Sequence, residues 1–119
     1  MPVRSLSSSV LRWPSKEIVD NAVRCWAWEN GQRLENVKKI GYFGSYARGD
    51  YGVGSDLDII VVLKQSDQPF ERRGTEWDAT DLPVPADLII FTEDELAGLE
   101  GRLRRVLHEE TVWVYERRA

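Results

Sequence analysis

Apolar and polar positions along the chain repeat with two different periods. In residues 16–29 apolar side chains recur every three or four positions, which predicts an amphipathic helix with Ser15 as its N-cap and Asn30-Gly31 at its end. Cys25 falls on the apolar stripe, so we expect it to pack in the core and not to act as a nucleophile. The other residues of the predicted stripe are Ile18, Val19, Ala22 and Trp26.

Short apolar runs without a helical period predict the strands. Residues 37–43 and 59–63 form the first two, and the second of these is a continuous branched run of the kind found in buried strands. Residues 86–91 and 111–115 predict two more strands. A glycine-rich loop joins the first two strands, with a helical turn expected over residues 46–48.

The remaining segments predict helical structure of two kinds. Residues 66–85 are rich in proline and irregular, and their motif FERRGTEW indicates either a short helix or a surface excursion. Residues 92–95, Thr-Glu-Asp-Glu, predict a capping box that opens a helix, which we expect to break at Gly98 or Gly101. The apolar stripe continues through Leu99, Leu103, Val106 and Leu107. We expect Arg102, Arg104 and Arg105 on a solvated face, and contact with phosphate is the alternative.

This order of elements predicts an α+β fold, in which helices pack on a small mixed β-sheet. The length of 119 residues is that of one domain. We expect residues 1–14, which are rich in arginine and serine, to be a loosely ordered N-terminal arm, and residues 15–119 to form the single domain.

Composition excludes several classes of function. A net charge of −4 argues against a nonspecific nucleic-acid binder, which needs a basic surface. One cysteine and one histidine exclude a disulfide framework and a zinc site built from those residues. No apolar run approaches the roughly 20 residues of a membrane span, and we expect a cytoplasmic protein. Five tryptophans are a heavy load for this length, so we expect a partner surface that involves Trp13, Trp28 or Trp77.

The glycine-rich segment GSYARGDYGVGSDLDIIVVL, residues 44–63, fits none of three common ligand-binding loops. As a P-loop it has Asp50-Tyr51 where lysine and a hydroxyl residue are needed. As a dinucleotide fingerprint it is followed by a strand where a helix must begin. As an EF-hand it lacks the central glycine and the final glutamate.

Two aspartates of this segment, Asp56 and Asp58, have a spacing that suits metal binding. Asp56 and Asp58 are two positions apart at the start of a strand, so their side chains share a face with Cα atoms about 6.5–7 Å apart. Carboxylates so placed can converge on cations spaced about 3.5–4 Å, as in two-metal phosphoryl-transfer sites. Asp87 opens its own apolar strand in the same way, and if the two strands are neighbours all three acids meet at one end of the sheet.

The glycines before the acids suit an anionic ligand. Gly44-Ser45, directly after the first strand, can turn backbone N–H groups and the serine hydroxyl toward phosphates. Arg48 either adds a positive charge against such phosphates or pairs with Asp50. A plain loop reading of Ser55-Asp56 stays open on the motif alone, because serine and aspartate after glycine are common in turns.

These residues carry a family resemblance. Gly44-Ser45, Arg48-Gly49 and Ser55-Asp56-x-Asp58 resemble the signature of the minimal nucleotidyltransferases, part of the DNA polymerase β-like nucleotidyltransferase superfamily. The similarity extends from about Ser15 to Glu116 and is sharp only at residues 44–58. It implies a polymerase β palm-like fold.

The resemblance also implies a function. It implies an enzyme that moves a nucleoside monophosphate, AMP from ATP or that of another nucleoside triphosphate, onto a hydroxyl acceptor. Asp56, Asp58 and Asp87 would hold two Mg²⁺ ions, and Gly44, Ser45, Arg48 and Ser55 would bind the nucleotide. It further implies a helical HEPN-type protein partner in a toxin–antitoxin pair, and homo-oligomerisation is left open. The alternatives are a catalytically silent nucleotide-binding or protein-interaction module of the same fold, and a metal-binding domain of unrelated chemistry.

Overall fold

The computed structural model describes residues 13–117. Residues 1–12 of the predicted N-terminal arm lie outside the described residues. The last two residues of that arm contact the domain: Trp13 packs against the core, and the carbonyl of Pro14 accepts a hydrogen bond from the Tyr46 hydroxyl at 3.0 Å. Within residues 13–117, no helix is long and apolar enough to cross a membrane.

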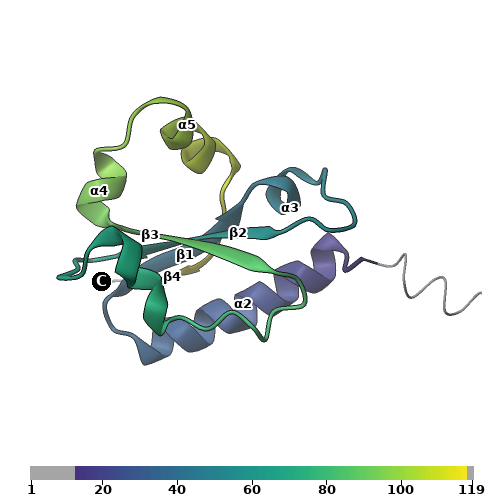
Figure 1. Cartoon of the computed structure of the whole chain (residues 1–119), viewed down its shortest axis with the longest axis horizontal. Coiled ribbons are helices and arrows are strands. Elements are labelled where there is room, and N and C mark those ends of the chain that lie inside the picture. The colour runs from purple at the N-terminus through teal and green to yellow at the C-terminus, as the bar shows by residue number, and fades with distance from the viewer. Residues whose placement is uncertain (1–12, 118–119) are drawn as a thin grey trace, which may run out of the picture.

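A four-stranded mixed sheet, in the order β3-β2-β1-β4, forms the middle of the molecule (Figure 1). β1 (Val37–Phe43) runs antiparallel to both β2 (Leu57–Leu63) and β4 (Val112–Glu116). β2 and β3 (Ala86–Thr92) are parallel neighbours. This arrangement confirms the predicted α+β class and its mixed sheet.

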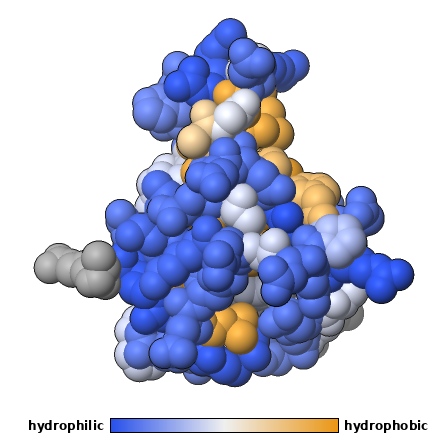
Figure 2. All heavy atoms as spheres, turned by 90° about the vertical axis from the view of Figure 1, so that its left-hand side faces the viewer, coloured by the Kyte–Doolittle hydropathy of each residue, from blue (hydrophilic) through white to orange (hydrophobic). Residues whose placement is uncertain are grey.

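Two helices lie above one face of the sheet (Figure 1). They are α4 (Glu93–Ala97) and α5 (Gly101–Glu110), separated at Gly98 within the predicted break. The predicted capping box is present, because Thr92 Oγ1 accepts from the Glu95 N–H at 3.2 Å and Glu95 Oε1 accepts from the Thr92 N–H at 2.9 Å. Seen from one side, the surface is mainly hydrophilic, and hydrophobic atoms run from the α4–α5 cap toward the body (Figure 2).

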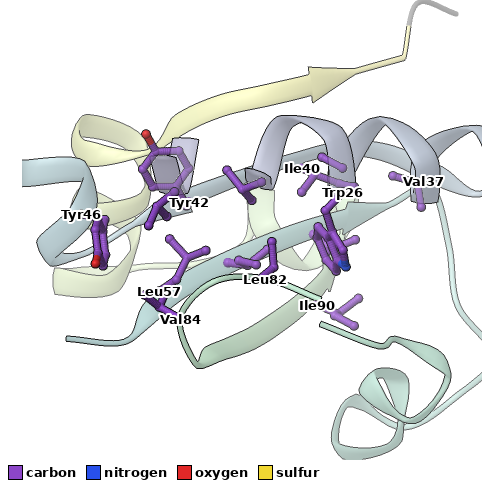
Figure 3. Packing of buried hydrophobic residues seen from close by; sticks show 14 of the residues in the cluster. Trp26, Val37, Ile40, Tyr42, Tyr46, Leu57, Leu82, Val84 and Ile90 are labelled. Carbon is purple, nitrogen blue, oxygen red and sulfur yellow. The ribbon is translucent and has the colours of Figure 1, made fainter. Parts of the chain in front are cut away.

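The opposite face of the sheet carries the larger core and the long helix α2 (Lys16–Arg33). Trp26 of α2 lies beside Ile40 of β1, and Leu57 of β2 belongs to the same core nearer to Tyr46 (Figure 3). The segment before β3 closes this core with Leu82 and Val84, which are both buried. It also contains the 3-10 helix η1 (Phe70–Glu76), the short helix that the motif FERRGTEW allowed.

The predicted apolar stripe of α2 was partly wrong. The buried apolar positions of α2 are Val19, Val23, Trp26 and Ala27. Each of them lies one residue after a residue of the expected stripe, so the buried face of the helix is rotated by one position. Ile18 is 55% exposed as a result. Cys25, which was expected in the core, is exposed on the outer face.

The predicted end of α2 was also wrong. The helix continues through Asn30 and Gly31 to Arg33, and both of those residues are buried. Asn30 Nδ2 donates to the Trp26 carbonyl at 2.8 Å, which suits a residue inside the helix. A Cβ atom at Gly31 would overlap the ring of Tyr115, so this glycine serves the close approach of α2 to β4 and not a helix end.

β2 begins two residues earlier than predicted. The Leu57 N–H donates to the Pro85 carbonyl at 2.8 Å, and Leu57 pairs with Ala86 of β3. Asp58 is therefore a residue of the strand itself and not of the loop before it.

Candidate functional site

Two of the three predicted acids are paired by the sheet. Asp58 on β2 and Asp87 on β3 are direct partners in the parallel ladder, and Phe43 on β1 is the partner of Asp58 on its other side. Side chains of paired residues point to the same face, so the two carboxylates share one face at one end of the sheet. Asp56 lies two residues before Asp58 and is exposed. The condition that the sequence left open, that the two strands are neighbours, is therefore met, and it brings Asp58 and Asp87 together.

The three acids influence one another through their charges. Burial raises the pKa of the Asp58 carboxyl above its ordinary value, and the negative charges of Asp87 and Asp56 raise that pKa further. The Arg48 guanidinium acts in the opposite direction. The site thus places two negative charges near a partly buried carboxylate, and a bound cation would relieve the repulsion between them.

Gly44 fits closely against Asp58. It is buried, has a φ of 83°, and ends β1 at the point where the chain turns into α3 (Ser45–Arg48). A Cβ atom built on Gly44 would overlap Asp58 Oδ2. Only glycine satisfies both the positive φ and the space left beside this carboxylate. Ser45 follows as the first residue of α3 and is half-buried.

Arg48 forms the surface ion pairs that sequence reasoning left open. Its Nε lies 3.0 Å from Asp50 Oδ2, and its Nη1 lies 3.2 Å from Glu110 Oε1 at the end of α5. Asp50 belongs to the glycine-rich loop, and Glu110 is the last residue of α5. Arg48 therefore ties α5 to this loop while its charge still reaches Asp58.

Ser55 shapes the loop that leads to the acids. The Gly52 N–H donates to Ser55 Oγ at 2.8 Å, and the Ser55 N–H donates to the Gly52 carbonyl at 3.0 Å. These two hydrogen bonds close a turn immediately before Asp56. The part that Ser55 plays toward a nucleotide stays a prediction.

Sequence reasoning missed two stacked tyrosines at the glycine-rich loop, Tyr46 and Tyr51, which we call the aromatic clamp. Tyr46 is fully buried and stacks on Tyr51, with ring centroids 4.4 Å apart. Tyr51 Oη accepts from the Lys16 N–H at 3.0 Å, and Lys16 Nζ donates to the Ala47 carbonyl at 3.3 Å. The clamp joins both sides of the loop to the start of α2. Its one signal in the sequence is a pair of tyrosines five positions apart in a glycine-rich segment.

The donor set suits a hard divalent cation. Magnesium prefers carboxylate oxygens, and Asp58 and Asp87 present two of them on one rigid edge. Within residues 13–117, no three acidic, histidine or cysteine side chains are already gathered tightly enough to hold a metal ion. Asp58 and Asp87 are fixed by the sheet, whereas Asp56 is in the loop, so the loop conformation decides whether a third carboxylate joins them.

Comparison with known families gives a match across most of the chain. A family model described as "Nucleotidyltransferase domain" matches residues 24–114. The matched span contains Gly44, Ser45, Arg48, Ser55 and the three acids.

One curated relative matches over a short stretch. A "Putative protein adenylyltransferase" of Methanocaldococcus jannaschii is 65% identical over 26 residues, which are 22% of this chain. The match spans 26% of the length of that relative.

Solved structures share the fold. A "putative nucleotidyltransferase" from Sulfolobus solfataricus superposes with a TM-score of 0.64 and 24% identity, over 86% of this chain and 84% of its own. A toxin–antitoxin complex with AMP-PNP has a TM-score of 0.58 at 20% identity, over 82% of this chain and 73% of that one. A mutant of the toxin–antitoxin complex MntA–HpeT has a TM-score of 0.55 at 17% identity, with the same coverages of 82% and 73%. At such low identities the likeness shows the fold alone.

Proposed function

This chain belongs to the nucleotidyltransferase domain family, and we propose on that basis that it transfers AMP from ATP to a hydroxyl group of a partner protein. The observation that carries the proposal is the pairing of Asp58 with Asp87 on parallel strands, directly beside Gly44. This places two fixed carboxylates next to a backbone turn that admits no side chain.

Each residue has a proposed part in the reaction. Asp58 and Asp87 would hold Mg²⁺ through their carboxylates, and Asp56 would join them from its loop. Gly44 and Ser45 take the triphosphate with backbone N–H groups and the serine hydroxyl, while Ser55 supports the loop. Arg48, which is half-exposed, adds positive charge at the rim. Two bound magnesium ions would supply charge stabilisation for the entering and leaving oxygens.

The transfer itself is a displacement at the α-phosphate. The acceptor hydroxyl gives its proton to solvent water, its oxygen forms a bond to the α-phosphorus, and the bond to the bridging oxygen breaks so that pyrophosphate leaves. The contribution of the chain is to fix the reacting groups in line and to face the developing negative charge. The rigid register of β2 and β3 suits this positioning role.

The acceptor and its partner are proposed from the similar proteins. The relative from Methanocaldococcus jannaschii is named for transfer of adenylyl groups to protein, which supports a protein hydroxyl as acceptor. Two structures of similar fold are toxin–antitoxin complexes, and one of them contains AMP-PNP, which supports ATP as donor. We therefore propose a HEPN-type helical protein as the partner, with this chain acting as the antitoxin.

The experiment uses purified chain, Mg²⁺ and ATP labelled at the α-phosphate, with and without a candidate partner protein. Label should move to the partner, and Asp58→Asn or Asp87→Asn should each reduce the rate at least about 100-fold, as expected when a group facing transition-state charge is lost. Asp67→Asn is the matched control, since this exposed acid follows the other end of β2, and it should keep the full rate.

Each result decides between two functions. Removal of a repelled carboxylate should leave thermal stability unchanged or raised in the Asp58 variant, so lost transfer would not reflect unfolding. Tight binding of Mg-ATP without transfer to any acceptor would indicate the catalytically silent module. Absence of nucleotide binding in the unmodified chain would overturn both.

A further inference from the structure

A cavity of about 360 Å³ lies on the same face of the sheet as the paired acids, between α4, α5 and the strands β1 and β4. Its volume is in the range of sites that take small ligands or single side chains. We call it the α5 basic pocket. Its lining includes Lys39, Leu96, Arg104, Leu107, His108 and Trp113.

The charge of this pocket differs from that of the whole chain. The chain has a net charge of −4, yet the pocket lining contains two permanent cations and a histidine and no acid. Among the described residues, neither Lys39 nor Arg104 forms an ion pair. Arg102 and Arg105 extend the positive charge along the exposed side of α5. Such a pocket selects for an anionic group.

The surroundings of Trp113 narrow the kind of anion. Lys39 Nζ lies 4.1 Å from the centroid of the Trp113 ring, so a cation already covers one face of this ring and a flat base cannot stack there. Glu109 and Glu110 end the positive run on α5, which interrupts the long basic track that a nucleic-acid strand requires. A single carboxylate with a short aliphatic stem fits the cations and the apolar floor of Leu96 and Leu107.

The register of the strands sets the distance from the pocket to the acids. Trp113 pairs with Gly41, and Gly41 is two residues from Phe43, the partner of Asp58. Lys39 is four residues from Phe43 on the same strand. At about 3.4 Å per residue along a strand and about 4.8 Å between strands, Trp113 on β4 lies roughly 12 Å and Lys39 on β1 roughly 14 Å from Asp58 on β2.

We propose that the α5 basic pocket binds an acidic side chain of the acceptor protein, about three to five residues from the hydroxyl that receives the nucleotide. An extended peptide rises by the same amount per residue as the strand, so a hydroxyl at the Asp58–Asp87 edge places such an acid over the pocket. The inference rests on the proposed transfer to a protein hydroxyl and adds the sequence class of the acceptor.

Binding is tested first, without ATP, on the full chain. Fluorescent eleven-residue peptides carry a central tyrosine, serine or threonine, with glutamate or glutamine three, four or five positions away, at physiological ionic strength. The glutamate peptides should bind at least about tenfold more tightly than the glutamine peptides, as expected for charge-assisted hydrogen bonds. Arg104→Glu should remove this difference. Arg72→Glu, an equal charge reversal on an exposed residue of η1, should keep it.

Transfer from labelled ATP to the same peptides separates the two proposals. Equal transfer to glutamate and glutamine peptides would overturn the proposed role of the α5 basic pocket and leave the proposed function intact. Selective binding of glutamate peptides with no transfer to any peptide or partner would support the pocket and count against the transferase. An oligonucleotide that binds more tightly than the glutamate peptides, and is released by Arg104→Glu, would overturn the inference in favour of nucleic acid.

Discussion

At the scale of single residues, Gly44 leaves the space that the Asp58 carboxylate occupies. Its φ of 83° costs a residue with a side chain about 1–3 kcal/mol of strain, and a Cβ atom there would overlap Asp58 Oδ2. Gly44→Ala should therefore displace the Asp58 carboxylate, lower the rate of nucleotide transfer at least about tenfold and reduce the thermal unfolding temperature. The rate is measured with labelled ATP and the temperature by circular dichroism.

Gly52→Ala is the matched control for that change. Gly52 is in the same loop, a Cβ atom there would meet nothing within 4 Å, and its φ is not positive. We expect no change in either measurement. Equal activity of the Gly44 and Gly52 variants would show that the close fit against Asp58 has no part in the reaction.

Sequence reasoning located the acids because their chemistry is local. Two carboxylates two positions apart before an apolar run, and a third before another such run, are visible without a structure. The burial of Cys25 was predicted wrongly for a related reason. The apolar residues of α2 allow two adjacent stripes, and the choice between them depends on the sheet that the helix meets.

At the scale of elements, Arg73 joins η1 to β3 and α4. Its buried guanidinium donates to the Ile90 carbonyl at 3.1 Å and to Glu95 Oε2 at 3.0 Å. The hydrogen bond from Arg73 to Glu95, with the one from the Thr92 N–H, lowers the pKa of the Glu95 carboxyl to about 2. Glu95 is thus both the capping-box residue of α4 and the partner of Arg73.

This lowered pKa predicts how stability depends on pH. An unfolded glutamate has a pKa of 4.5, so the ionised Glu95 stabilises the fold fully above that pH. The contribution should be lost progressively as the pH falls from about 4.5 to about 2, because the unfolded chain then binds the proton first. Urea unfolding across this range should show the free energy of unfolding falling more steeply in the unmodified chain than in Glu95→Gln.

Glu93→Gln is the control for the removal of a carboxylate from α4, because Glu93 is exposed on the same short helix and forms no ion pair among the described residues. Its free energy of unfolding should fall with decreasing pH as steeply as that of the unmodified chain. A Glu95→Gln curve with the same slope as the other two would mean that Arg73 does not hold this carboxylate in solution.

Gly31 shows how one glycine sets the contact between two elements. The ring of Tyr115 on β4 occupies the position that a Cβ atom of Gly31 would need. Gly31→Ala should destabilise the fold by about 1–3 kcal/mol in urea unfolding, although alanine favours helices, because the overlap outweighs the propensity. Gly98→Ala places its Cβ no closer than 3.5 Å to other atoms and should be nearly neutral.

A second variant shows whether the overlap is the cause. Tyr115→Ala removes the ring, and Gly31→Ala made in that background should cost much less than in the unmodified chain. The same cost in both backgrounds would be evidence against the close packing of α2 on β4.

At the scale of the whole molecule, the sequence predicted the class of fold better than its arrangement. The mixed sheet followed from the order of helices and strands, and the proximity of Asp58 and Asp87 followed once β2 and β3 were assumed to be neighbours. The strand order, the position of α5 over the sheet and the basic pocket beneath it depend on contacts between distant segments. No local period of the sequence records such contacts.

The tryptophans of α2 are divided between the core and the surface. Trp26 is 6% exposed, and its Nε1 donates to the Asp78 carbonyl at 2.9 Å, which pins the proline-rich segment to α2. It also lies 5.6 Å from the ring of Trp77, measured between centroids. Trp28, two positions along the helix, is 60% exposed, and of the three tryptophans expected at a partner surface it is the one on the open side of α2.

Trp26→Ala should therefore cost about 3–5 kcal/mol of unfolding free energy, as for other large aromatic side chains removed from a core. Trp28→Ala should stay within about 0.5 kcal/mol of the unmodified chain, as is usual for surface positions. Both values come from urea unfolding followed by circular dichroism, which does not depend on tryptophan fluorescence. Similar costs for the two substitutions would mean that the segment before β3 is not held by Trp26, and the edge that carries Asp87 would then lack its support on that side.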